Sequence, residues 1–216
     1  MRARIASIAG LLFTVPAFAD PLGSCLVDRA REQIGVTVRY DSGYSRIAFP
    51  GGDVPADRGV CTDVLIRAYR RVNLDLQDLV HSDMSSAWSR YPKLWGLSRP
   101  DTNIDHRRVP NLATFFARHG KSLAISQEPS AYAAGDIVTW ELAAGVPHVG
   151  IVSDKKSADG TPLVVHNIGR GAAEENMLFN YKITGHYRYT PPSMAQACAA
   201  PVSSGSRREG RPLPGR

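Results

Sequence analysis

The sequence lacks the short motifs that mark several large enzyme classes. It has no Gly-x-Ser-x-Gly elbow, no phosphate-binding loop, no Gly-x-Gly-x-x-Gly fingerprint and no His-Glu-x-x-His pair. The usual ligand spacings of a zinc site are absent too, so we expect no metal and no other cofactor. Beyond the first 19 residues no apolar run approaches the length of a membrane span, and we expect none there.

Net charge is scarce in the body of the chain, although the whole sequence is basic. The formal net charge is +6, of which Arg2 and Arg4 supply two units and the tail 205–216 supplies three, so about +1 remains for residues 20–204. A nucleic-acid-binding surface needs a concentrated basic patch. The charge distribution therefore argues against a nucleic-acid partner.

Cysteine is also rare, with 3 residues in a chain of 216. Cys25 and Cys198 lie near the two ends of the predicted domain, where an oxidising compartment would allow a disulfide between the termini. Cys61 is then the odd, free thiol, which in an exported protein points to a reactive group.

The first 19 residues have the pattern of a secretory signal peptide. A positive start precedes the apolar run Ile5–Phe18, and Ala17–Ala19 is a small-x-small cleavage site. We expect cleavage before Asp20 and a periplasmic or secreted protein; the alternative is a lipoprotein signal with Cys25 as the lipidated residue. Residues 20–190 are long enough for one catalytic domain, and the composition of residues 191–216 predicts a basic, disordered tail.

Hydrophobic spacing predicts helices in the first half of the chain and strands in the second. Helices are expected over 25–34, 61–72, within 75–92 and over 111–119, and strands over 136–140, 148–153, 163–168 and 183–189. Helices followed by antiparallel strands indicate an α+β fold, with helices packed on a small antiparallel sheet.

Cys61 opens one of the predicted helices. It shares an apolar stripe with Val64, Leu65 and Ala68, so the thiol lies in the first turn and faces the rest of the protein. Unpaired backbone N–H groups and the helix dipole at that position favour a thiolate and would help to bind an oxyanion. The alternative interpretation is a small buried hydrophobic residue at a helix start.

A thiol nucleophile needs a base, and the base needs an orienting partner. His148 begins one predicted strand, and the strand 163–168 returns after a ten-residue connection. Antiparallel pairing about the midpoint of that connection places His148 opposite Asn167, and a shift of one residue places it opposite His166. The sequence leaves open which of the two orients His148.

These residues resemble the pattern of the NlpC/P60 family, papain-like cysteine peptidases that mostly cut the peptide stems of bacterial cell walls. The resemblance runs through Cys61, the segments 135–140 and 148–152, and His166, and it implies that Cys61 is the nucleophile, His148 the base and His166 the third polar residue. From about residue 30 to 189 the chain is also similar to a bacterial family called domain of unknown function 1287. That similarity is carried by the segments 33–37, 59–63, 103–111, 135–140, 147–154, 165–169 and 183–188.

The nucleophile segment departs from the NlpC/P60 pattern. Those enzymes usually read Asp-Cys-Ser-Gly, whereas this chain reads Val60–Asp63, and Phe49 stands where they often carry a tyrosine that supports the oxyanion. Because phenylalanine cannot donate a hydrogen bond, we expect Tyr40, Tyr44 or the backbone to take that role. The departures therefore concern the residues around the nucleophile and the substrate that they would bind, while the catalytic pair fits the family pattern.

Several charged residues near the site have two interpretations. Asp63 in the first helical turn either stabilises the helix dipole or faces the substrate. Asp105, His106, Arg107 and Arg108 crowd a polar loop. The arginines of this loop either hold a substrate carboxylate, such as a free peptide terminus, or belong to a structural ion-pair network.

The sequence thus predicts an exported, monomeric cysteine hydrolase that cleaves an amide bond, with a cell-wall (peptidoglycan) peptide as substrate. A transacylase would use the same acyl-enzyme chemistry. The alternative from another class is a non-catalytic periplasmic module that binds wall peptides or a protein partner.

Overall fold

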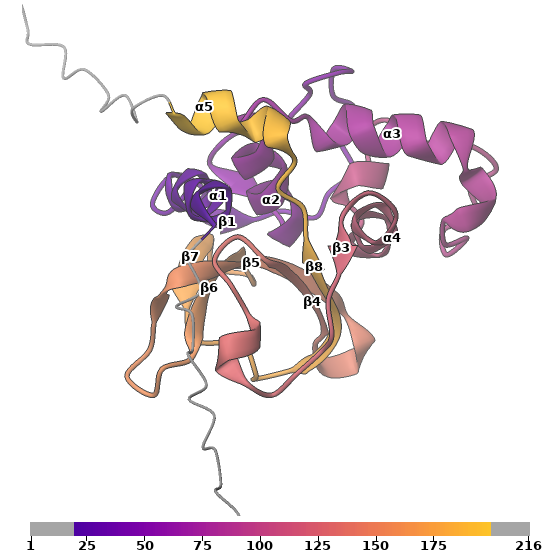
Figure 1. Ribbon diagram of the computed structural model, residues 1–216. Helices are drawn as coiled ribbons and strands as arrows, with labels where there is room; N and C mark the ends of the chain where they lie inside the picture. The colour runs from indigo at the N-terminus through magenta and orange to yellow at the C-terminus, as the bar shows by residue number, and fades with distance from the viewer. Residues whose placement is uncertain (1–19, 200–216) are drawn as a thin grey trace, which may run out of the picture.

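The structure, a computed structural model, describes residues 20–199. The predicted signal peptide, residues 1–19, and most of the predicted tail, residues 200–216, lie outside the described residues. Within the described part, helices pack on one face of a curled antiparallel sheet (Figure 1). This is the α+β architecture that the hydrophobic spacing predicts.

Four of the five described helices lie close to their predicted positions: α1 (Pro21–Arg31), α2 (Cys61–Arg70), α3 (Leu76–Ser86) and α4 (Val109–His119). The fifth, α5 (Ala195–Ala199), was not predicted. Helix α1 begins four residues earlier than predicted, because the Asp20 carboxylate accepts the N–H of Leu22 at 3.0 Å and Pro21 occupies the first turn. None of the described helices has the length and apolar character needed to cross a bilayer.

Eight strands are described, in two sheets. They are β1 (Arg39–Tyr40), β2 (Arg58–Gly59), β3 (Lys121–Ser122), β4 (Ile137–Glu141), β5 (Pro147–Lys156), β6 (Pro162–Asn167), β7 (Ala172–Glu175) and β8 (Lys182–Arg188). Strands β1 and β2 form a parallel pair, and the other six form an antiparallel sheet in the order β3-β8-β4-β5-β6-β7. The sequence did not predict the two-residue strands β1, β2 and β3, which are too short for a period, or β7, whose four residues include no β-branched or aromatic side chain.

The main core lies between the sheet and helices α1, α2 and α4. Leu65, Phe116, Val149 and Ile151 are fully or almost fully buried there. A second apolar cluster, which contains Trp140, fills the other face of the sheet. Because side chains alternate along a strand, β5 points Val149 and Ile151 towards the helices and Val152 towards the second cluster. The site described below lies where α2 begins and β5 begins.

Residues 191–199 are ordered, which corrects the prediction of a disordered tail for this part. Cys198 and Cys25 form a disulfide with their Cα atoms 5.7 Å apart, and Met194 is fully buried. The hydroxyl of Thr190 donates to Asp20 at 3.1 Å. The disulfide and the buried methionine hold this segment against α1, although the segment has few other large apolar side chains.

Candidate active site

Cys61 is the first residue of α2 and the cysteine that takes no part in the disulfide. It is only 4% exposed and borders a cavity of about 200 Å³ with mostly apolar walls. The other lining residues are Tyr40, Ser42, Val60, Trp95, Ile104, Arg107, Arg108, Val109, Pro110, Val146 and Pro147. The thiol thus lies beside a small pocket between the start of α2, the start of β5 and the loop before α4.

Burial dominates the acid–base behaviour of the Cys61 thiol. Loss of solvent raises its pKa to about 12, and the negative charge of Asp63 acts in the same direction. The backbone N–H groups of Val149, Thr62 and Cys61 oppose this rise but are outweighed. The expected preference for thiolate at a helix start does not hold in so closed a pocket. The resting thiol is neutral, and its proton must be removed during a reaction.

Asp63 caps the start of α2 and holds Arg107. Its carboxylate accepts the N–H of Val60 at 2.7 Å and both Nε and Nη2 of Arg107 at 2.9 Å. Both side chains of this ion pair are 3% exposed. Of the two interpretations that the sequence allows, the structure therefore shows the structural one for Asp63. The guanidinium of Arg107 is occupied in the same ion pair.

His148 is the second residue of β5 and is 2% exposed. Burial lowers the pKa of its imidazole to about 3, with a smaller contribution from His166, so the resting ring is neutral and a weaker base than a histidine in water. Among the described residues, no hydrogen bond joins this ring to Cys61. The chain neighbours of His148 are what approach the nucleophile: the N–H of Val149 acts on the sulfur, and Pro147 borders the Cys61 cavity. Catalytic pairs of this kind commonly tighten only when substrate binds.

The structure brings His166 to His148. His148 Nε2 and His166 Nδ1 lie 2.9 Å apart, with the two rings nearly perpendicular. Strands β5 and β6 pair with Ile151 opposite Val165, which is one residue away from the register predicted from the loop midpoint, because the pairing is irregular near the hairpin. The two histidines are therefore diagonal neighbours on one face of the sheet and not directly opposite each other.

Asn167, the other proposed orienting residue, forms a hydrogen bond with the loop before the nucleophile. Its amide nitrogen donates to the carbonyl of Gly59 at 3.0 Å, two residues before Cys61. Its amide oxygen accepts the N–H groups of Gly169 and Gly171 at 3.1 and 3.2 Å. Asn167 thus ties the end of β6 to the start of α2, and it faces away from His148.

Glu175 lies on the far side of His166 and was missed by sequence reasoning, because β7 was not predicted. Its Oε2 lies 3.3 Å from His166 Nε2, although the pair does not have the geometry of a hydrogen bond. Burial lowers the pKa of His166, and the charge of Glu175 opposes that shift. His166 consequently lies between a histidine on one side and a carboxylate on the other.

Of the two tyrosines proposed to support an oxyanion, Tyr40 lies beside the Cys61 cavity. Burial raises its pKa to about 12, with a smaller contribution from the charge of Asp63, so the phenol keeps the proton that it would donate. Tyr44 donates to Asp101 at 3.0 Å in a separate cavity. The structure therefore brings Tyr40 to the nucleophile and leaves Tyr44 outside the site.

The polar loop before α4 divides into buried and accessible residues. Asp105 and His106 are each 2% exposed, and burial lowers the pKa of His106 to about 3. Arg108 borders the Cys61 cavity, and its guanidinium lies 4.0 Å from the ring centre of Trp95. Asp105 holds Arg108 at 3.1 Å. Arg108 is therefore the member of this loop that is placed to contact a bound molecule, and Trp95 is a second residue that the sequence did not single out.

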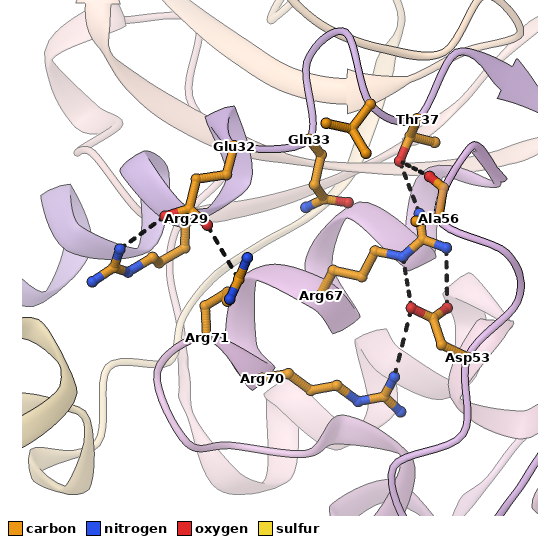
Figure 2. Close-up of a pocket in the computed structure, with 10 residues that line it drawn as sticks. Arg29, Glu32, Gln33, Thr37, Asp53, Ala56, Arg67, Arg70 and Arg71 are labelled. Carbon is orange, nitrogen blue, oxygen red and sulfur yellow. Dashed lines mark hydrogen bonds and ion pairs between the residues drawn. The ribbon is translucent and has the colours of Figure 1, made fainter. Parts of the chain in front are cut away.

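A second cavity, of about 300 Å³, lies at the other end of α2 (Figure 2). Its arginines are committed to ion pairs: Arg67 bonds Asp53 at 2.8 and 3.0 Å, and Arg29 and Arg71 share Glu32 at 2.8 and 3.2 Å. These pairs join α1, α2 and the loop before α2. The cavity contains none of the candidate catalytic residues, and its charges are explained by the packing of the two helices.

The comparison with protein families agrees with the resemblance seen in the sequence. The model of the family "Domain of unknown function (DUF1287)" matches residues 27–189. The chain belongs to this family. One relative of this DUF1287 protein is "Uncharacterized protein YijF" of Escherichia coli (strain K12), which is 58% identical over 164 residues, or 76% of this chain and 80% of that protein.

Two solved structures are distantly similar to this DUF1287 protein. NlpC1 from Trichomonas vaginalis matches with a TM-score of 0.42 and 14% identity, over 82% of this chain but only 46% of that one. An N-acetylmuramoyl-L-alanine amidase from Bacteroides uniformis matches with a TM-score of 0.44 and 14% identity, over 78% of this chain and 98% of that one.

Proposed function

We propose that this protein is an exported cysteine hydrolase that cleaves an amide bond in cell-wall peptides. The observation that carries the proposal is the placement of a free cysteine at a helix start, beside a pocket, next to the strand that holds the His148–His166 pair. A neutral thiol and a neutral imidazole are the starting state that base catalysis requires.

In the proposed reaction, Cys61 Sγ attacks the carbonyl carbon while its proton passes to His148. The tetrahedral intermediate then expels the amine, which takes the proton from His148, and a thioester remains on Cys61. Water attacks this thioester, gives one proton through His148 to the departing sulfur and releases the acid. The backbone N–H groups around Cys61, with the phenol of Tyr40, are the donors available to the oxyanion.

Arg108 supports a substrate that carries a carboxylate. Its guanidinium borders the pocket and lies over the ring of Trp95, which places a planar donor beside the nucleophile. Wall peptides contain such groups, and the sequence resemblance to NlpC/P60 enzymes supports the same class. The signal-peptide pattern of residues 1–19 supports export to the compartment in which these peptides occur.

The test is digestion of purified cell-wall fragments, with the products identified by mass spectrometry. We expect the native protein to release one peptide fragment, and the Cys61→Ala and His148→Ala variants to release none. Arg71→Gln, which alters an exposed residue at the other end of α2, is the matched control and should digest as the native protein does. Equal digestion by native protein and Cys61→Ala would refute the proposal.

A non-catalytic binding module is the second candidate. The observation in its favour is the closed state of the site, with the thiol pKa raised to about 12 and no hydrogen bond between Cys61 and His148 among the described residues. A binding module would retain wall fragments in a pull-down without altering them, and Cys61→Ala would bind equally well. Turnover that depends on Cys61 would exclude it.

A further inference from the structure

One ring nitrogen of His166 is buried and is not used by the contact between His166 and His148. Nδ1 of His166 faces His148, whereas Nε2 is buried, makes no hydrogen bond to any residue of the described range 20–199 and lies 3.3 Å from Glu175 Oε2. Buried polar atoms in folded proteins almost always have a partner. A small rotation of the Glu175 side chain, which is 37% exposed and so has room to move, would complete the bond.

The proton on His166 decides which atom of His148 can act as a base. One hydrogen must lie between His148 Nε2 and His166 Nδ1, since the two nitrogens are 2.9 Å apart. If His166 supplied that hydrogen, the proton of His148 would sit on Nδ1, and no lone pair would be left for the thiol. If His148 supplies it, Nδ1 of His148 carries the lone pair, and His166 must carry its own proton on Nε2.

We infer that Glu175 is a positioning residue that selects this second arrangement, by accepting the Nε2 proton of His166. The inference rests on the proposed function, because only a base at His148 gives the arrangement a purpose. The relay then reads Glu175, His166, His148 and Cys61, in which the carboxylate contacts neither substrate nor sulfur. Its role is to keep His166 an acceptor towards His148.

The strand register supports this assignment. Val164 of β6 pairs with Glu175 of β7, and His166 pairs with Ala173, so Glu175 and His166 are diagonal neighbours on one face. Glu174 points to the opposite face, where it bonds Arg31, Ser153 and Lys155.

The titratable and charged groups around His166 come from three segments. His148 faces it from β5 and Glu175 from β7, and Arg170 lies in the connection between β6 and β7. Arg170 Nη2 lies 3.2 Å from the other oxygen of Glu175, so the carboxylate is held on one side by Arg170 and is directed to His166 on the other.

The experiment reads the tautomer directly by nitrogen NMR of protein labelled at histidine. We expect His166 to be protonated at Nε2 in the native protein and to lose that preference in Glu175→Ala. Glu175→Gln should keep the tautomer, because an amide oxygen accepts the same proton, and it also covers the case in which Glu175→Ala does not fold. Glu141→Gln, an exposed carboxylate at the end of β4, is the matched control and should change nothing.

A second readout is the rate at which an alkylating agent modifies Cys61 at neutral pH. We expect Glu175→Ala to slow it about tenfold, as when a partner that orients an imidazole is removed, and Glu175→Gln to slow it less. A native His166 protonated at Nδ1, or a tautomer unchanged in Glu175→Ala, would overturn the inference. Because the tautomer is read without substrate, that failure is distinct from failure of the wall-digestion test, which would count against the hydrolase itself.

Discussion

Replacement of Asp63 by asparagine tests whether the pair beside the nucleophile is structural. Asp63→Asn keeps the shape and an oxygen for the Val60 N–H, but it removes the charge that neutralises Arg107. Since both side chains are 3% exposed, Arg107 is left as an unpaired buried cation. Breaking a buried pair in this way costs about 3–5 kcal/mol, a large share of the roughly 5–15 kcal/mol that stabilises a typical domain.

The assay is urea unfolding of the two proteins at pH 7, followed by circular dichroism. Asp57→Asn is the control, because its pair with Arg39 is exposed at both residues and should cost about 1 kcal/mol or less. Asp63→Asn also removes a negative charge that raises the pKa of Cys61, so the thiol should become more acidic and react faster with an alkylating agent. A loss of stability equal to that of the control, with unchanged thiol reactivity, would refute this account of Asp63.

Three further predictions concern the fold around the site. Acid should destabilise the protein as the pH falls from about 6.5 towards about 3. In this window the unfolded chain protonates His106 and His148, whereas the folded chain does not. The melting temperature should therefore fall less with pH in His106→Asn than in the native protein. Loss of the disulfide in Cys25→Ala/Cys198→Ala should cost up to about 5 kcal/mol in urea unfolding, since the bond closes a segment of 173 residues; no change under non-reducing conditions would contradict the assigned pair. Gly150→Ala should lower the stability of the folded protein by about 1–3 kcal/mol, because a β-carbon there would lie 2.5 Å from a methyl group of Val164 and 3.2 Å from the β-carbon of His166. Thermal unfolding measures this loss, and a stability equal to that of the native protein would indicate that β5 and β6 are further apart than described.

The helices and most of the sheet follow from local patterns in the sequence. The apolar stripe of α2 and the β-branched runs of β5 and β6 have strong periodicity, and they form where the pattern predicts. Strand β7 and helix α5 do not, because β7 has no residues with strand preference and α5 is held by the Cys25–Cys198 bond. Their formation depends on contacts with segments far away in the chain, which no local pattern contains.

The site shows the same division. The spacing of residues identified Cys61 at a helix start and His148 at a strand start, and it limited the orienting residue to His166 or Asn167. The spacing could not decide between His166 and Asn167, because a shift of one residue in the pairing of β5 and β6 exchanges the face of the sheet on which each side chain lies. That pairing depends on an irregular hairpin. The spacing also could not find Glu175 or Trp95, which approach the site from a strand and a loop that have no motif of their own.

Residue identity and local periodicity establish which chemical groups lie at the starts of α2 and β5, namely the thiol of Cys61 and the imidazole of His148. The protonation states of these two groups depend on the tertiary structure. For Cys61, the rise in pKa caused by burial exceeds the lowering by the backbone N–H groups at the helix start, so the thiol stays neutral. Burial keeps the His148 imidazole neutral as well. Desolvation depends on what surrounds a group in space, and the chain around Cys61 comes from four segments that are distant in sequence.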